Sequence, residues 1–382
     1  MRSQCFIITL HTKNTKKMVK VNVRFTGEDK LDFIRDLRKT VTDYFETKKI
    51  SKYGNFNLVI KTVFMMVLYL GPFALMFLGV ITSFWGVFAC WVSAGVGMSG
   101  VGMVTMHDAN HNSFSKNQSI NKFLGNTIYL LGGFPATWKH QHNTLHHGFT
   151  NIDGHDEDIN PGPFLRLSPH KPLYKVHKLQ HLYAWFFYGL MTIAWITAKD
   201  FKQLYTYKKN NAPLSNKLSY TQLLVILILS KILYYVIFMI IPIIILPLAW
   251  YWIVVFFVVM HFTSGFLLTV IFQTAHVVPT SEYPLPNEEG TIENNWAVHQ
   301  LYTTSDFSPK NRILSWLMGG LNFQVEHHLF PDISHVHYHK ISDIVKLMAK
   351  KYNLPYYVQP SFIKAVSEHA KMLKRLGNSY SI

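Results

Sequence analysis

Four long apolar stretches interrupt an otherwise polar and basic chain. The first two, residues 62–81 and 83–105, contain no charged residue and follow one another almost without a linker. The other two, residues 232–248 and 250–272, form a similar pair later in the chain. A helix that crosses a bilayer needs about 20 mostly apolar residues. The pattern therefore predicts an all-α integral membrane protein with four transmembrane helices in two hairpins.

Small and charged residues refine this prediction. Glycines allow helices to pack closely in lipid, and the second stretch contains Gly86, Gly95, Gly97, Gly100 and Gly102. Lys231 interrupts an apolar run that begins at Leu223. Because a charge inside the bilayer is costly, we expect Lys231 at the cytosolic interface, directly before the third span.

Residues 182–198 form a fifth apolar segment that is only just long enough to span a membrane. If it crossed, three spans would separate the histidines near residue 142 from those near residue 327, which would then lie on opposite sides. If it lies in the interface, all the histidine groups share one side. The segment is rich in aromatic residues, which favour an interfacial position. We therefore expect four spans.

Lys and Arg indicate the orientation of the chain. They are frequent outside the hairpins, whereas neither hairpin tip carries a charge. By the positive-inside rule, the regions 1–61, 106–231 and 273–382 face the cytoplasm, together with both termini. These regions are expected to form a helical cap that includes helices over residues 30–48, 341–350 and 362–376.

Composition agrees with a single membrane-embedded unit. Of the 382 residues, 49% are hydrophobic and 15% are charged, against about 25% charged in ordinary soluble domains. The net charge of +16 suggests nucleic acid as a partner. However, Lys and Arg flank the apolar segments and form no stripe, so no nucleic-acid partner is expected. The two cysteines, Cys5 and Cys90, predict no disulfide framework.

Histidines cluster at the predicted cytosolic ends of the spans. His107 and His111 follow the second span, and on an α-helix this spacing places both rings on one face. An isolated pair of this kind is more often solvated or a helix cap. Here the pattern recurs, because His276 ends the fourth span and two further groups are His142/His146/His147 and Gln324/His327/His328. Such a concentration predicts a metal centre.

The number of histidines indicates more than one metal ion. A zinc ion takes four protein ligands in a structural site and about three in a catalytic one, and haem takes one or two histidines. Eight imidazoles therefore suit two metals with about four each. Imidazole binds iron, copper, zinc or nickel. Iron is the prediction, because two neighbouring redox metals can share the electron changes of dioxygen cleavage.

The order H-x-x-x-H, H-x-x-x-H-H and Q-x-x-H-H resembles the membrane fatty acyl desaturases over about residues 55–355. The segment 319–331, GGLNFQVEHHLFP, is similar to the signature of the front-end subgroup, which inserts a double bond between an existing one and the carboxyl end. The resemblance implies a four-span stem, a cytosolic cap with a di-iron site, and an acyl tunnel. It also implies a location in a membrane, here expected to be a bacterial inner membrane.

The resemblance also implies a reaction and its partners. Two hydrogens would be removed from adjacent methylenes of a long-chain acyl-CoA or acyl-lipid, with dioxygen as co-substrate and a cis double bond as product. The sequence contains no His-Pro-Gly-Gly motif of a fused haem domain. The two electrons are therefore expected from a separate ferredoxin or a small cytochrome with its reductase. Gln324 is expected as a weaker ligand, direct or through water, and the implied iron ligands are His107, His111, His142, His146, His147, His276, His327 and His328.

Other polar residues are candidates for holding the ligands in place. Metal-bound imidazoles usually donate their second N–H to a carboxylate or carbonyl. The candidates, each equally compatible with a cap or a surface position, are Asp108, Asn110, Asn151, Asp156, Asp158, His299 and Glu326. His140 is out of register with its neighbours and is left out of the site. His261 is expected as a hydrogen-bonded helix-packing residue, and the alternating His335, His337 and His339 as surface residues.

The role of one group of basic residues stays open. Either a phosphate head group or the membrane surface in general would suit Arg166, Lys171, Lys175 and Lys178.

A different reaction on the same scaffold is the nearest alternative function: hydroxylation, sphingolipid desaturation, or carotenoid or alkane oxidation. A non-enzymatic metal-binding protein or transporter is the alternative from another class. It predicts polar residues along the spans, and the spans contain almost none.

Overall fold

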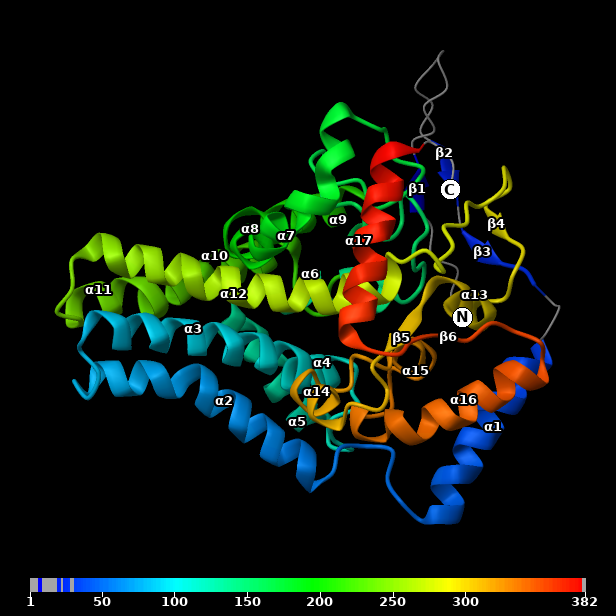
Figure 1. Ribbon diagram of the computed structural model, residues 1–382, viewed down its shortest axis with the longest axis horizontal. Coiled ribbons are helices and arrows are strands. Elements are labelled where there is room, and N and C mark those ends of the chain that lie inside the picture. Colours follow the sequence, from blue (N-terminus) through cyan, green and yellow to red (C-terminus); the bar gives the residue numbers. More distant parts are fainter. Residues whose placement is uncertain (1–5, 9–18, 22, 28–30, 380–382) are drawn as a thin grey trace.

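The fold is described from a computed structural model, which covers residues 6–8, 19–21, 23–27 and 31–379. Cys5 lies outside these described residues. Among them, four helices are long and apolar enough to span a membrane: Phe56–Phe77, Phe84–Asn110, Tyr220–Ile245 and Trp250–His276. The predicted four-span helical architecture is confirmed. In Figure 1 the four helices run side by side, and the remaining elements gather as a cap at one end.

The first hairpin consists of α2 (Phe56–Phe77) and a second helix that changes its winding twice. The second helix begins as α3 (Phe84–Gly100), becomes the π-helix η1 (Val101–Met106) and ends as α4 (His107–Asn110). A β-carbon on Gly97 would lie 2.3 Å from the backbone nitrogen of Tyr69 in α2. Only glycine fits there, so the predicted close packing through glycine is present.

The second hairpin consists of α10 (Tyr220–Tyr235), the π-helix η7 (Val236–Ile240) and α11 (Ile241–Ile245), followed by α12 (Trp250–His276). Its first helix begins earlier than the expected span, so Lys231 lies inside it and is buried. Its side chain thus points into the protein and not toward solvent. The reason is a buried carboxylate, Asp200, whose Oδ2 is 2.6 Å from the Lys231 Nζ.

The apolar segment at 182–198 is broken into short pieces. It comprises most of α7 (Gln180–Gly189), α8 (Met191–Ala194) and most of the π-helix η6 (Trp195–Lys199), and continues into α9 (Asp200–Lys209). The pieces α7 and α8 pack on α12. This segment is not among the span-length helices of the described residues. This agrees with the prediction that it does not add a fifth span.

The cap is built from the N-terminal region, the insert between the hairpins and the C-terminal region (Figure 1). Helix α1 (Leu31–Lys48) packs on α16 (Tyr338–Lys351), and α17 (Phe362–Asn378) packs on α7 and α12. These three helices confirm the predicted ones. The shorter helices are α5 (Gln118–Gly125), η2 (Asn126–Leu131), α6 (Pro135–Lys139), η3 (His140–His146), η4 (Glu157–Ile159), η5 (Lys175–Leu179), α13 (Trp296–Thr303), α14 (Arg312–Leu317), α15 (Gln324–Leu329) and η8 (His335–His337).

The described residues contain three two-stranded sheets, two of which join distant parts of the cap, and the sequence did not predict them. The strands β1 (Phe6–Ile8) and β2 (Val19–Val21) pair antiparallel. The other pairs are parallel: β3 (Arg24–Phe25) with β4 (Thr291–Ile292), and β5 (Ser305–Phe307) with β6 (Tyr357–Gln359). These strands are too short to show a period-two pattern.

The outer faces of the spanning helices are apolar and exposed. Val67 of α2 is 62% exposed and Ile244 of α11 is 75% exposed. Contiguous apolar surface of this kind is rare on soluble monomers. A lipid environment around the stem accounts for it.

Candidate metal centre

Four separate elements bring the histidines together at the cap end of the stem. His107 opens α4 at the end of the second span, and His276 is the last residue of α12. The π-helix η3 provides His142 and His146, and the short helix α15 provides His327 and His328. All of these side chains are buried. A metal-binding arrangement therefore depends on the packing of the cap on both hairpins.

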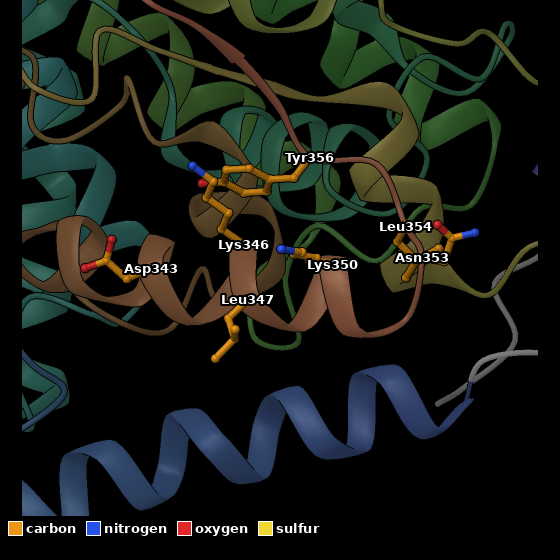
Figure 2. Close-up of a pocket in the computed structure, with 7 residues that line it drawn as sticks. All are labelled: Asp343, Lys346, Leu347, Lys350, Asn353, Leu354 and Tyr356. Atoms are coloured by element: carbon orange, nitrogen blue, oxygen red, sulfur yellow. The ribbon is translucent and has the colours of Figure 1, made fainter.

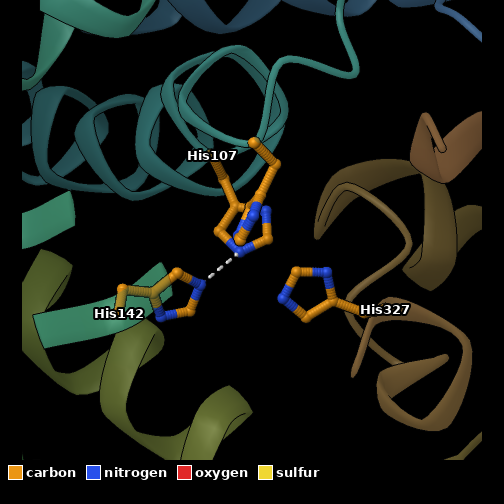
Figure 3. A group of neighbouring side chains, drawn as sticks. His107, His142 and His327 are labelled. Carbon is orange, nitrogen blue, oxygen red and sulfur yellow. Dashed lines mark hydrogen bonds between the residues drawn. The ribbon is translucent and has the colours of Figure 1, made fainter. Parts of the chain in front are cut away.

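The first group of ligand atoms comes from His107, His111, His142 and His327. One imidazole nitrogen from each lies within 4.8 Å of the others. The Nε2 atoms of His107 and His142 are 3.0 Å apart (Figure 3). Figure 3 also shows the His327 ring, from a different element, pointing toward the same centre.

The second group comes from His146, His276 and His328, whose nitrogens also lie within 4.8 Å of one another. His147 sits between the two groups. Its ring centroid is 4.5 Å from that of His327 and 4.4 Å from that of His328. The two candidate metal positions are thus neighbours.

The H-x-x-x-H-H segment is π-helical, which changes the expected pairing of its histidines. The backbone N–H of His147 donates to the carbonyl of His142, five residues earlier, at 3.1 Å. As a result His142 joins the first group and His146 the second. In a regular α-helix, the four-residue spacing would have placed His142 and His146 on one face. Single π-turns occur often at functional sites, and here the turn distributes one segment over both groups.

The unpaired nitrogens of these rings fit a bound metal. The Nε2 atoms of His111, His276, His327 and His328 are buried and find no hydrogen-bond partner among the described residues. Buried polar atoms are rarely left without a partner. The same holds for both amide atoms of Gln324. Metal coordination would satisfy the four imidazole nitrogens and, directly or through water, the Gln324 Oε1 atom.

Electrostatics keep most of these imidazoles neutral, the form that binds metals. Burial lowers the pKa of His111, His142 and His147 well below the ordinary value, and neighbouring histidines add to the effect. Burial lowers the pKa of His327 and His328 in the same way. These five imidazoles are therefore ready to accept cations without losing protons first.

His146 differs because carboxylates lie beside it. Its Nδ1–H donates to Asp156, with both carboxylate oxygens at 3.2 Å, and Asp158 Oδ2 is 3.6 Å away. Burial disfavours the charged imidazole, but the two carboxylates outweigh it and raise the pKa of His146. Asp156 also accepts from the backbone N–H of Asn151 at 2.9 Å. The Asn151 amide donates in turn to the carbonyl of His276 at 2.9 Å.

A narrow cavity of about 110 Å³ opens onto the first group. Two of its walls are His107 and His142 themselves. Most other walls are apolar, including Met106, Leu131, Trp138, Met191, Trp195, Leu268 and Phe272, and the polar ones are Gln141, Asp158, Lys199, Thr269 and Gln273. The lining suits part of an apolar chain beside the metal ligands.

A larger surface groove of about 520 Å³ on α16 has a different character (Figure 2). It is lined mainly by polar residues such as Lys346 and Lys350, and none of its lining residues is a histidine. Tyr356 closes its inner side by donating hydrogen bonds to Asp306 and Glu326 at 2.7 and 2.9 Å. The smaller cavity is therefore the one connected with the metal centre.

Comparison with known proteins identifies the family. Residues 82–360 match the family model for fatty acid desaturases. The protein belongs to the fatty acid desaturase family. The match covers most of the chain and confirms the resemblance drawn from the histidine motifs. The protein is thus an oxidoreductase that desaturates fatty acids.

The similarity to individual relatives covers almost the whole length of the desaturase. It is 31% identical over 363 residues to an sn-1 linoleoyl-lipid 6-desaturase of Arthrospira platensis, covering 94% of this chain and 96% of the relative. It is 30% identical over 364 residues to the enzyme of the same name from Synechocystis sp., covering 94% and 98%. An acyl-lipid (8-3)-desaturase of Physcomitrium patens is 30% identical over 368 residues, covering 94% and 75%.

The polar residues that were expected to support the site fall into two sets, those beside it and those that form hydrogen bonds elsewhere. Asp156, Asp158 and Asn151 lie beside it, as described above. The others make their hydrogen bonds elsewhere: Asn110 donates to the Gly125 carbonyl at 3.1 Å, and His299 Nε2 lies 2.8 Å from the Thr150 carbonyl. Asp108 accepts from Ser334 Oγ at 2.8 Å, and Glu326 from Tyr356. In these hydrogen bonds none of the four residues contacts a site histidine.

Some supporting residues of the desaturase were missed by sequence reasoning. His328 Nδ1 is 2.8 Å from Gln300 Oε1, and His327 Nδ1 is 3.3 Å from the Tyr338 hydroxyl. Nothing in the sequence marks Gln300 or Tyr338. The Trp138 ring stacks on His142 with centroids 4.5 Å apart. Trp138 precedes His142 by four residues, and that helical spacing was a usable signal.

Two predictions about the remaining basic residues are wrong. His335 is buried rather than on the surface, with Nε2 3.1 Å from Lys61 Nζ and Nδ1 3.0 Å from Asp108 Oδ2. Arg166 is buried as well and donates to backbone carbonyls, including that of Ser379 at 2.8 Å. It ties the cap together and does not face a head group. In both cases buried acceptors supplied by distant segments made burial possible.

Other placements agree with expectation. His261 is buried in α12, with Nε2 3.0 Å from the Tyr234 hydroxyl, as a helix-packing residue should be. His140 is buried against Tyr207 and belongs to neither metal group. Lys171, whose two interpretations stay open, forms an ion pair with Asp153 at 3.1 Å.

Proposed function

We propose that the protein is a front-end desaturase that inserts a cis double bond into long acyl chains carried by membrane lipids. The observation that carries the proposal is the pair of adjacent histidine groups at the end of four spans, opening onto an apolar cavity. The signature around Gln324 and the names of the relatives, which are lipid desaturases, support the front-end class and the lipid carrier.

Iron is the proposed metal. One ion would be held by His107, His111, His142 and His327, and the other by His146, His276 and His328. His147 lies between them, and Gln324 would complete a coordination shell directly or through water. When bound, the two ions would supply the dioxygen chemistry that removes hydrogen from unactivated methylenes. Imidazole sets of this kind suit iron.

The protein's own contribution is position and exclusion of water. Trp138 and Phe272 flank His142 and line the cavity, so an acyl chain there would pass close to the first group. Holding the reacting carbons in place can supply much of the rate enhancement. Apolar walls also keep water from the reacting atoms. Asp156 holds the proton on His146 Nδ1 and so presents Nε2 to the metal.

The cellular context is part of the proposal. Electrons would come from a separate ferredoxin or small cytochrome with its reductase. The cap would face the cytoplasm, because the basic residues flank the spans on the cap side and the hairpin tips are uncharged. A bacterial inner membrane is the proposed location.

Expression in a host fed defined fatty acids tests the function. We expect new cis double bonds on the carboxyl side of an existing one, located by mass spectrometry of derivatised products and found first in the lipid fraction. His142→Ala should abolish them and lower the iron content, and it controls for host enzymes. Products that retain oxygen would indicate a hydroxylase. No new unsaturation or oxidation with a competent donor would contradict the proposal.

A further inference from the structure

A buried ion pair joins the third span to the insert. Lys231 of α10 and Asp200 at the start of α9 are both buried, with Nζ and Oδ2 2.6 Å apart. Charged groups within a membrane helix are expensive, and they mark function by default. A buried pair is also weak evidence for stability, because desolvation offsets its attraction. The pair therefore calls for a role beyond holding the fold.

The pair fixes several neighbouring groups. The Lys231 ammonium also donates to the carbonyl oxygens of Gly132 and Trp195, at 2.5 and 3.0 Å. The second oxygen of Asp200 accepts from the Trp195 indole N–H at 3.1 Å and from the Thr137 hydroxyl at 2.7 Å. Trp195 is thus held at both its backbone and its ring.

The groups held in this way form walls of the cavity beside the metal ligands. Trp195 lines it, and so does Trp138, the neighbour of Thr137. The Trp138 ring stacks on His142, a ligand of the first group. A β-carbon on Gly133 would lie 2.5 Å from the Trp195 ring, so the chain next to Gly132 closes tightly on that ring. One ion pair is therefore linked to two aromatic walls of this cavity, directly through Trp195 and through Thr137 next to Trp138.

We propose that Lys231 and Asp200 are positioning residues that fix the Trp195 and Trp138 walls and thereby select which carbon pair of the acyl chain meets the metal centre. The proposal rests on the proposed function, because it requires an acyl chain in this cavity. A small displacement of the walls would shift the chain along the cavity. The pair touches neither metal group, so it would change the position of the double bond without removing the metals.

The test compares the products of variants in cells fed one polyunsaturated fatty acid. The double variant Lys231→Met/Asp200→Leu removes all the tethers without leaving one charge unpaired. Thr137→Val and Trp195→Phe each remove a single hydrogen bond to Asp200 and leave the ion pair in place. Ser230→Ala is the matched control, because its hydroxyl donates to the Leu227 carbonyl in the same helix and, among the described residues, makes no other hydrogen bond. The readout is the ratio of positional isomers, which does not depend on how much enzyme folds.

We expect the double variant to change that ratio by about twofold or more, since shifts of about 1 Å at reacting atoms alter rates strongly. Thr137→Val and Trp195→Phe should change it in the same direction, and Ser230→Ala should match the wild type. If the double variant does not accumulate, the two single variants decide. Wild-type ratios in every variant that makes product would overturn the inference. Absence of product from the wild type would instead overturn the proposed function.

Discussion

At the scale of single residues, the second nitrogen of several site histidines is held by a specific partner. Asp156 accepts from His146, Gln300 Oε1 lies 2.8 Å from His328 Nδ1, and the Thr303 carbonyl lies 3.4 Å from His276 Nδ1. Such contacts set which nitrogen faces the metal and how the ring is turned. The ligand positions therefore depend on residues that never touch a metal.

Gln300→Ala tests this dependence. Loss of the contact to His328 Nδ1 should weaken iron binding by about 10- to 100-fold, the usual effect of removing such a partner. Metal analysis of the purified protein across a chelator series measures the change. Gln118→Ala, at an exposed position of α5, is the control and should bind iron like the wild type. Equal iron retention by both variants would contradict the assigned role of Gln300.

At the scale of elements, the π-turns and the helix contacts place the histidines. The second span carries the π-helix η1 directly before His107, and η3 divides its histidines between the two groups. The span itself is positioned by close packing on α2 and α12. Gly95 contributes on the α12 side, where a β-carbon would lie 2.6 Å from the Met260 carbonyl. The metal centre therefore depends on distances set inside the membrane.

Gly97→Ala should destabilise the desaturase by about 1–3 kcal/mol, the usual effect of overpacking. The reason is that the added carbon would meet the α2 backbone at 2.3 Å. Thermal unfolding in detergent measures the loss. Gly71→Ala is the matched control, since the nearest atom to its added carbon is a Val67 methyl at 3.6 Å. A Gly97→Ala protein as stable as the control would show that the two helices separate easily.

At the scale of the whole molecule, both hairpins enter the membrane from the cap, and all the histidine groups lie at that end (Figure 1). The broken segment α7–α8–η6 lies against α12 and does not add a span. An even number of crossings keeps the ligands from the insert and from the C-terminal region on one side. The histidine groups from the insert and from the C-terminal region can meet only with this parity.

Cysteine labelling tests the orientation of the molecule. In a Cys5→Ser/Cys90→Ala background, Thr82→Cys places a thiol at the first hairpin tip and Lys49→Cys places one in the cap. A membrane-impermeant maleimide should label Thr82→Cys in intact spheroplasts. It should label Lys49→Cys only after permeabilisation, because the proposed orientation places the basic cap in the cytoplasm. The reverse pattern would mean that the cap faces outward.

Local sequence patterns predicted the number of spans, the histidine groups and the family. Span length and motif spacing are local properties, set by the apolar thickness of the bilayer and by neighbouring residues along one chain. The long helices of the cap were also predictable from local pattern. These features did not require knowledge of what each segment packs against.

Only the tertiary structure decided the environment of single polar groups. Lys231 and His335 are buried because Asp200 and Asp108, each from a distant segment, lie beside them. The same packing chose Gln300 as the partner of His328 and divided the histidines of η3 between two groups. Burial of a charge or an imidazole depends on partners brought from elsewhere in the chain, and no local pattern contains that information.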